Sequence, residues 1–261
     1  MSRGFLALLP PSETKRDGGS AVFAIDSLAW DEQSEVRART VSELMQLATD
    51  PAEHQRVLKL SAQKSSDEIV RNAELSKAPA MPAVERYTGV LYDALDAETL
   101  STTAREWLDA HVAIQSALLG LIQASDEIPA YRLSASTRLA NEAMQRRWTQ
   151  VCADVLSRHD GPILDLRSKA YVALGPLPDR ENAVYAEITT RDEDGTIRSL
   201  NHFNKRAKGL IVRAFAQNTD AHGRLDELGG VEDLATVFAA IGGFDAEPLD
   251  ERTLQVIIRE Q

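Results

Sequence analysis

Residues 5–9 are five consecutive apolar side chains, and two prolines, Pro10 and Pro11, follow them directly. A short apolar run of this length is typical of a buried strand. The strand has to end at residue 9, because proline has no backbone N–H to donate to a β-ladder. Its apolar faces must be covered by other parts of the chain, so we expect it to share one structural unit with the other strands, packed by helices.

The other strands are predicted by short apolar or alternating runs bounded by turns. They are residues 163–166, residues 253–258 and a hairpin whose strands, 184–190 and 196–203, flank an acidic turn at 192–195. An acidic turn with a glycine between two such runs is a strong hairpin signal.

Helices are indicated by apolar residues that recur every three or four positions at 41–48, 144–155 and 207–215. Asn204 is expected to cap the last of these helices. Cys152 lies on the apolar face of the second, so we expect a small core residue rather than a reactive thiol. Strands and helices do not alternate regularly. This favours an α+β fold, a mixed β-sheet packed by helices, over a doubly wound sheet.

The chain has 261 residues and is predicted to form a single compact domain, 1–261, with a basic cleft. A loop break is possible near 76–82, and the segment 218–261 is acidic. The formal net charge of −11 excludes a non-specific DNA coat, because the phosphate backbone would repel such a protein at long range. One cysteine and no long apolar segment predict a cytoplasmic protein without a disulfide or a membrane span.

The common cofactor and metal motifs are absent. The sequence contains no G-x-G-x-x-G, no P-loop and no H-E-x-x-H, and its five histidines lack the spacing of metal ligands. We therefore expect no cofactor and no metal. His202 is a weak candidate for an acid or base, against the alternative of a structural histidine. No set of nucleophile, base and orienting group can be identified, so the sequence does not establish catalysis.

A cluster of basic residues stands out in this acidic chain. Between residues 195 and 217 there are five cations and no acidic residue: Arg198, Lys205, Arg206, Lys208 and Arg213. Lys205 and Lys208 are three residues apart, so they share one face of the predicted helix, in its first turn. The cluster is either an anion-binding site or a solvated basic face. Gly209 would let a ligand or a neighbouring backbone approach closely.

Other cations stand at the ends of apolar elements. Ser12 and Lys15 follow the first strand, Arg132 lies between apolar neighbours, and Arg167 follows the strand at 163–166. Each arginine could instead pair with a buried carboxylate such as Asp165. Because these positions recur at the ends of apolar elements, we expect Lys15, Arg132, Arg167, Lys205 and Lys208 to converge on one anion-binding cleft.

Five segments also resemble a known family when taken together. In chain order they are residues 8–15 (LLPPSETK), 86–92 (RYTGVLY), 128–133 (IPAYRL), 165–168 (DLRS) and 204–209 (NKRAKG). The set resembles the peroxide stress protein YaaA family, in particular an actinobacterial-looking branch, from about residue 5 to residue 217. Two features depart from the family. The chain has a high negative charge, with an acidic helix–helix turn near Gly229, and Arg167-Ser168 replaces the Ala-Ser of other branches.

The resemblance implies a bacterial cytoplasmic protein of mixed α/β fold with a positively charged cleft. It also implies a role in limiting iron-linked oxidative damage, and it is associated with DNA binding. The residues assigned to the anion or nucleic-acid site are Ser12, Lys15, Arg132, Arg167, Ser168, Asn204, Lys205, Lys208 and Arg213.

Two functions remain open after the sequence analysis. The first is a stress-response protein that binds DNA or another polyanion without turning it over. The second is an enzyme that acts on a small phosphorylated or nucleotide-like substrate in the same cleft. The salt dependence of binding separates them, because a long polyanion gives a steep log–log slope and a small anion does not. The sequence gives neither the oligomeric state nor the physiological ligand.

Overall fold

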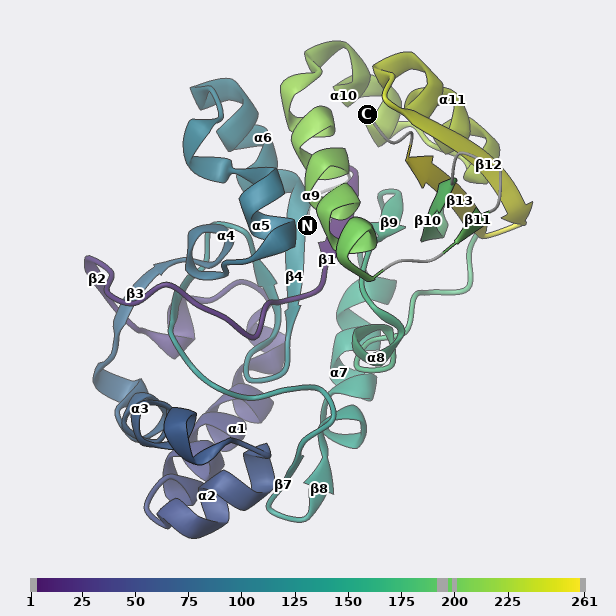
Figure 1. Cartoon of the computed structure of the whole chain (residues 1–261). Helices are drawn as coiled ribbons and strands as arrows, with labels where there is room; N and C mark the ends of the chain where they lie inside the picture. Colours follow the sequence, from purple (N-terminus) through teal and green to yellow (C-terminus); the bar gives the residue numbers. More distant parts are fainter. Residues whose placement is uncertain (1–3, 192–196, 199–200, 259–261) are drawn as a thin grey trace.

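A β-sheet built around the apolar N-terminal strand occupies the middle of the molecule (Figure 1). The computed structural model describes residues 4–191, 197–198 and 201–258. Within these residues the sheet has eight strands, in the order β12-β13-β10-β9-β1-β4-β5, with β11 paired to β10. The strands are β1 (Leu6–Leu9), β4 (Val112–Ser116), β5 (Gly120–Gln123), β9 (Ile163–Asp165), β10 (Ala183–Arg191), β11 (Ile197–Arg198), β12 (Phe244–Asp250) and β13 (Thr253–Ile258).

The central strands β4, β1, β9, β10 and β13 run parallel to one another. In this register Leu8 of β1 lies between Ala113 of β4 and Asp165 of β9. Every residue of β1, β4 and β9 is buried, as expected for parallel strands that are covered on both faces. The edge strands β5 and β12 are antiparallel to their neighbours. The predicted mixed β-sheet packed by helices is confirmed; the sequence had not indicated which of its strands are parallel.

Helices cover this sheet. Helix α9 packs against α5, α6 and β10, α11 packs against β12 and β13, and α7 packs against β5. Figure 1 shows α9 beside α5 and α6. These helices, with α10 and two short ones, are α4 (Ala83–Arg86), α5 (Val90–Leu95), α6 (Thr102–His111), α7 (Met144–Ser157), α8 (Lys169–Val172), α9 (Asn201–Gln217), α10 (Thr219–Asp226) and α11 (Val231–Ile241).

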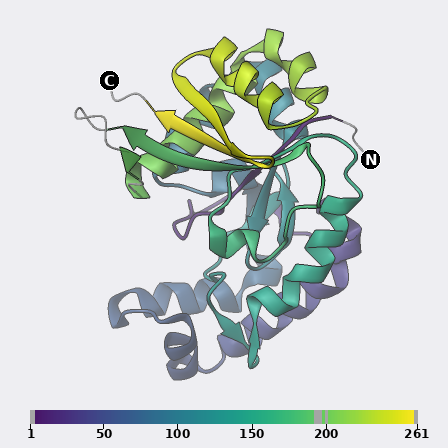
Figure 2. The ribbon, with the colours of Figure 1, turned by 90° about the vertical axis from the view of Figure 1, so that its right-hand side faces the viewer.

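A second group of elements lies at the end of the molecule opposite α10 and α11, as Figures 1 and 2 both show. It contains α1 (Ser34–Leu47), α2 (Pro51–Leu58), α3 (Ala62–Ala73) and the paired strands β7 (Arg138–Leu139) and β8 (Glu142–Ala143). A small sheet joins β2 (Ala21–Val22), β3 (Pro79–Pro82) and β6 (Glu127–Pro129). Short 3-10 helices are η1 (Ile25–Ser27), η2 (Asp31–Gln33), η3 (Leu75–Lys77) and η4 (Ala97–Thr99). The buried apolar residues of both groups form one core, whose members run in the sequence from Phe5 to Val256.

Three expectations about local structure are wrong. In the described residues, the strand predicted at 196–203 is limited to β11. Residues 201–203 are helical, because α9 begins at Asn201. The turn predicted at 192–195 lies outside the described residues. Asn204 is therefore inside α9 rather than at its cap, and its side-chain amide donates to the Ile188 carbonyl of β10, 3.1 Å away. The loop expected near 76–82 contains η3 and β3, because Ala80 pairs with Ala21 and Pro129.

Other local predictions are confirmed. The last strand spans residues 253–258, as expected, and α7 carries the predicted apolar face. Cys152 has no exposed surface, and burial raises the pKa of its thiol to about 11, which keeps it protonated and unreactive. Among the described residues, no helix is long and apolar enough to cross a membrane.

Candidate functional site

A pocket of about 770 Å³ lies where β1 and β9 end. Residues 10–14, which follow β1, form one wall, and residues 168–171, which follow β9, form another. The chain leaves β1 to build β4 on one side and later returns to build β9 on the other. Open α/β sheets bind their ligands beyond the carboxyl ends of the strands at such a switch of direction. We therefore take this pocket as the candidate site.

Helix α9 supplies two lysines to the pocket. Asn204, Lys205 and Lys208 all line it, and the bond from Asn204 to Ile188 fixes this part of α9 against β10. Both lysines were predicted to lie in the first turn of the helix, and this is wrong. Lys205 is the fifth residue of α9, so both lie beyond the first turn. Their spacing of three residues still places both on one face of the helix.

Lys208 is a buried cation that has no carboxylate partner within the described residues. It is only 5% exposed, and in this part of the chain its ammonium makes one hydrogen bond, of 3.5 Å, to the Arg167 carbonyl. Burial lowers the pKa of Lys208 to about 8; Lys205 lowers it further, whereas the charge of Asp165 opposes the shift. A buried cation that lacks a neutralising partner is unfavourable unless a ligand supplies the opposite charge.

Arg167, by contrast, is already neutralised. Its guanidinium is fully buried and bonds both oxygens of Asp165, at 2.8 and 2.6 Å, and also the Gly175 carbonyl at 2.8 Å. Pairing with Asp165 was the alternative that the sequence left open, and it is the arrangement present in the fold. Arg167 therefore does not line the pocket, although its neighbour Ser168 does.

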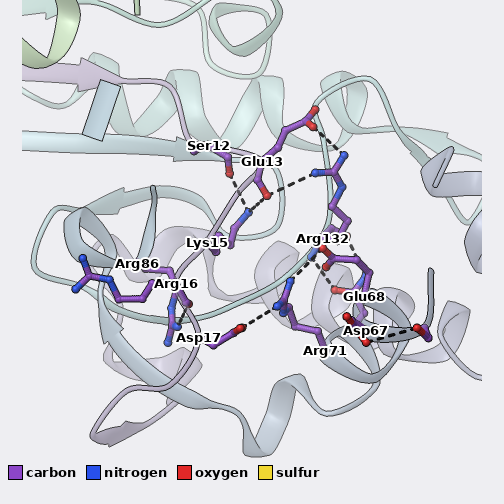
Figure 3. Close-up of polar contacts among 12 residues, drawn as sticks. Ser12, Glu13, Lys15, Arg16, Asp17, Asp67, Glu68, Arg71, Arg86 and Arg132 are labelled. Carbon is purple, nitrogen blue, oxygen red and sulfur yellow. Dashed lines mark hydrogen bonds and ion pairs between the residues drawn. The ribbon is translucent and has the colours of Figure 1, made fainter. Parts of the chain in front are cut away.

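Lys15 and Arg132 do not line the pocket; Figure 3 shows them beside Ser12 and Glu13, which belong to the wall that follows β1. The Lys15 ammonium donates to the Ser12 carbonyl at 2.9 Å and lies 4.1 Å from the centre of the Tyr131 ring. Burial, and then the charge of Arg132, lowers the pKa of Lys15 to about 7. Arg132 pairs with the Glu13 carboxylate at 2.8 Å. Because Glu13 lines the pocket, this ion pair cancels the negative charge of that wall.

Hydroxyl groups continue this cluster into the core. The Tyr87 and Tyr131 hydroxyls are 2.8 Å apart, and Ser116 Oγ is 2.7 Å from the Tyr131 oxygen. Burial raises the pKa of both tyrosines, so the hydroxyls stay protonated and serve as structural hydrogen-bond partners. The cluster fixes the loop that carries Ser12 and Glu13.

The structure therefore separates the residues that were predicted to converge. Five of them line the pocket: Ser12, Ser168, Asn204, Lys205 and Lys208. Lys15 and Arg132 do not line it, and Arg167 is in the core. Arg213 donates to the Leu95 and Asp96 carbonyls at the end of α5, at 2.9 and 2.8 Å, away from the pocket. The side chain of His202 lies outside the described residues.

Some lining residues were not proposed from the sequence. They include Thr88 and Gly89 before α5, Lys169 and Tyr171 after β9, and Tyr185 on β10. Sequence reasoning could have found the first four, because they lie in or directly after segments that contain the family motifs or basic residues. Tyr185 gave no signal, because its place depends on the pairing of β10 with β9. In the described part of the chain no group of three or more His, Cys, Asp or Glu residues could hold a metal ion.

A second hollow, of about 700 Å³, lies between α1, α2 and β7. Its lining includes the acidic residues Glu43, Asp50 and Glu53 together with the basic residues Arg56 and Arg138. Glu53 pairs with Arg56 on its own helix. Mixed and internally paired charges do not favour an anion there, in contrast to the pocket beside β1.

Comparison with known proteins places the chain in a family. A family model described as peroxide stress protein YaaA matches residues 5–235. The chain belongs to this family. The match extends beyond residue 217, where the resemblance in the sequence was expected to end, and so includes part of the acidic C-terminal segment.

Curated relatives of the chain carry the name UPF0246 protein. A UPF0246 protein of Corynebacterium efficiens is 43% identical over 81% of this chain and 84% of its own length. One from Corynebacterium glutamicum is 36% identical over 97% of this chain and its full length. One from Streptomyces coelicolor is 35% identical over 88% and 90%. The predicted actinobacterial branch is thus confirmed.

Proposed function

We propose that this chain acts in the peroxide stress response by binding a small phosphate-bearing molecule in the pocket beyond β1 and β9. The observation that carries the proposal is Lys208, a buried ammonium that lines the pocket and has no carboxylate partner among the described residues. An anionic ligand would supply the missing charge, and a phosphate is a strong acceptor for lysine.

The charges around the pocket also support an anion. Lys169, Lys205 and Lys208 line it, and Arg132 neutralises its carboxylate, Glu13. The lining hydroxyls of Ser12, Thr14 and Ser168 add donors for phosphate oxygens. A volume of about 770 Å³ is in the range of small-molecule sites and suits a nucleotide-sized ligand.

Binding of DNA or another polyanion is the second function, and the family resemblance supports it. The charge distribution favours DNA binding less than it favours the binding of a small anion. Arg132, Arg167 and Arg213 are engaged with protein carboxylates and carbonyls, and the chain has a net charge of −11. A duplex is held by many exposed cations along its backbone. In either form, we propose that the protein works in the cytoplasm and that binding serves to limit iron-linked oxidative damage.

Thermal unfolding with inorganic phosphate, a mononucleotide and a short DNA duplex tests this proposal. A ligand at about 100 times its Kd stabilises the folded state by about 2.7 kcal/mol, so the wild-type melting temperature should rise clearly. Lys205→Glu should abolish most of this rise, because it reverses a charge in the pocket. Lys77→Glu, the same charge change at an exposed lysine outside the pocket, should leave it intact.

The same experiment distinguishes the two functions. A rise with phosphate and mononucleotide supports a small ligand, whereas a rise with the duplex alone supports DNA. If no anion stabilises the wild type more than the Lys205→Glu variant, the pocket does not bind anions and the proposal is wrong.

A further inference from the structure

Asp165 is the carboxylate whose charge acts on Lys208, but it pairs with Arg167. Both oxygens of Asp165 are bonded by Arg167, and within the described residues the Lys208 ammonium has one hydrogen bond, of 3.5 Å, to the Arg167 carbonyl. Lys208 lines the pocket, and that carbonyl directly precedes Ser168, another lining residue. In the described part of the chain, the fold thus holds a long amine at the pocket without an ion pair that would keep it charged.

A second amine strengthens this effect. Lys205 lines the same pocket three residues earlier on α9. Burial lowers the pKa of Lys208 to about 8, and repulsion between the two neighbouring ammonium groups adds to this shift, whereas the charge of Asp165 opposes it. A desolvated lysine beside another cation is a known arrangement for a nucleophilic amine, since only the neutral nitrogen has a free electron pair.

We infer that Lys208 is a nucleophile that forms a Schiff base with an aldehyde or ketone whose phosphate group is held by Lys205 and Lys169. This inference rests on the proposed phosphate-binding function and adds to it the chemical class of the ligand, a phosphorylated carbonyl compound. While it is protonated, Lys208 helps to attract the anion; after it has lost its proton it reacts, and Lys205 and Lys169 hold the phosphate.

The reaction balances without an oxidant or a reductant. The neutral Lys208 nitrogen attacks the carbonyl carbon, a C–N bond forms as the C–O π bond breaks, and one N–H proton passes to the oxygen to give a neutral carbinolamine. A proton taken from solvent then converts the hydroxyl group to water, which leaves with the electrons of the C–O bond while the nitrogen lone pair forms the C=N bond. The resulting iminium returns one proton to solvent, so the amine and the carbonyl compound give an imine and one water. Tyr171 and Tyr185 line the pocket, and burial raises the pKa of both, so each keeps a hydroxyl proton that it can donate in a hydrogen bond.

Reductive trapping tests this step. The whole protein is incubated with glyceraldehyde 3-phosphate and sodium cyanoborohydride, which reduces an imine to a stable amine, and the modified lysines are identified by peptide mass mapping. Because the pocket holds the aldehyde next to the amine, Lys208 should be labelled at least about tenfold more than exposed Lys59 or Lys77 in the same sample. Glyceraldehyde, which lacks the phosphate, should lose most of this preference.

Lys208→Arg is the matched variant, since it keeps the positive charge but replaces the nucleophilic amine. It should lose the dominant adduct, whereas Lys77→Arg, the same change at an exposed lysine outside the pocket, should keep it. Lys208→Met serves as a second variant, and thermal unfolding shows whether each one folds. Labelling of Lys208 no greater than that of Lys59 and Lys77 would overturn the inference, as would dominant labelling of Lys15.

The two proposals fail in different ways. If inorganic phosphate stabilises the wild type but no Lys208 adduct forms, the pocket binds anions and the nucleophile is wrong. If phosphate has no effect either, the proposed function itself is wrong.

Discussion

Buried cations in this protein differ in what neutralises them. Arg86 is fully buried and donates to the Ile128, Gly18 and Pro79 carbonyls, so it joins β6 and β3 to the loop after β1. Arg167 has a carboxylate, Asp165. Lys15 has carbonyls and an aromatic face, and within the described residues Lys208 has a single hydrogen bond, of 3.5 Å. Of these four cations, Lys208 is the one that lines the pocket.

Replacing Arg167 should destabilise the fold strongly. Arg167→Met leaves the buried Asp165 carboxylate without its partner, which costs about 3–5 kcal/mol in comparable cases. The loss should appear in urea unfolding. Lys169→Met, at an exposed neighbour, should change the free energy of unfolding by less than about 0.5 kcal/mol. Equal effects of the two substitutions would contradict a structural role for Arg167.

Lys15 should make stability depend on pH. Its pKa is lowered from 10.5 to about 7 in the folded protein, so between these values the unfolded chain binds more protons. The free energy of unfolding therefore rises with pH in this window, and below about pH 7 the contribution is constant and unfavourable. Lys15→Met removes the titrating group. The wild type should consequently gain stability relative to this variant between about pH 7 and 10 in chemical unfolding. A constant difference would show that the lysine titrates normally.

At the scale of elements, α9 positions the pocket lysines. Asn204 bonds it to β10, and Arg213 bonds it to the end of α5. Between them Gly209 lets α5 approach, since an added Cβ would lie 2.1 Å from the Leu91 carbonyl oxygen and 2.9 Å from the Leu95 nitrogen. The glycine predicted to allow a close approach therefore serves a neighbouring backbone. Lys205 and Lys208 are placed by these three contacts.

Gly209→Ala should force α9 and α5 apart. The expected cost is about 1–3 kcal/mol from overpacking, together with weaker phosphate stabilisation because Lys205 and Lys208 move with the helix. Gly223→Ala in α10 is the control, since its Cβ would meet nothing within 4 Å. That substitution should be neutral or stabilise the protein by up to about 1 kcal/mol, because alanine favours helix. Thermal unfolding of both variants, with and without phosphate, measures the difference.

At the scale of the whole molecule, the protein is strongly acidic, whereas the charged residues that line the pocket beyond β1 and β9 are three lysines and one glutamate. The acidic residues outnumber the basic ones in two long parts of the chain, with eighteen against nine in residues 26–127 and ten against three in residues 218–261. The negative charge around the pocket repels a long polyanion along its whole length, whereas it repels a small anion only while that anion approaches the pocket. This distribution agrees better with a small ligand than with a duplex lying along the surface.

The salt dependence of binding should therefore be shallow. Each phosphate of B-DNA that a protein neutralises contributes about −0.9 to the slope of log affinity against log salt concentration. One phosphate group held by two or three lysines should give a slope no steeper than about −2, whereas a duplex with six or more phosphate contacts should exceed about −5. Titration of a mononucleotide and of a duplex over a range of salt concentrations measures both slopes. A steep slope with tight duplex binding would favour the DNA function.

Much of the fold follows from local pattern. The sequence predicted three strands, β1, β9 and β13, and also the apolar face of α7 and the burial of Cys152. These features were predictable because the spacing of apolar residues in a strand or helix indicates which of its faces is buried. The five segments that indicated the family also lie in the matched region. The start of α9 was not predictable from the run at 196–203, since strand-like composition there is overridden by packing against α5 and β10.

The site depended on the tertiary structure. In sequence, Arg167 and Lys208 look alike, each a cation beside an apolar element. Only the fold decides that Asp165 binds Arg167 through both of its oxygens, so that Lys208 is left at the pocket wall. One carboxylate cannot satisfy two buried cations equally, and which of them it pairs with depends on the distances set by β9 and α9. The sequence determined that there would be basic residues at the ends of apolar elements; the tertiary structure determined which of them would remain available to a ligand.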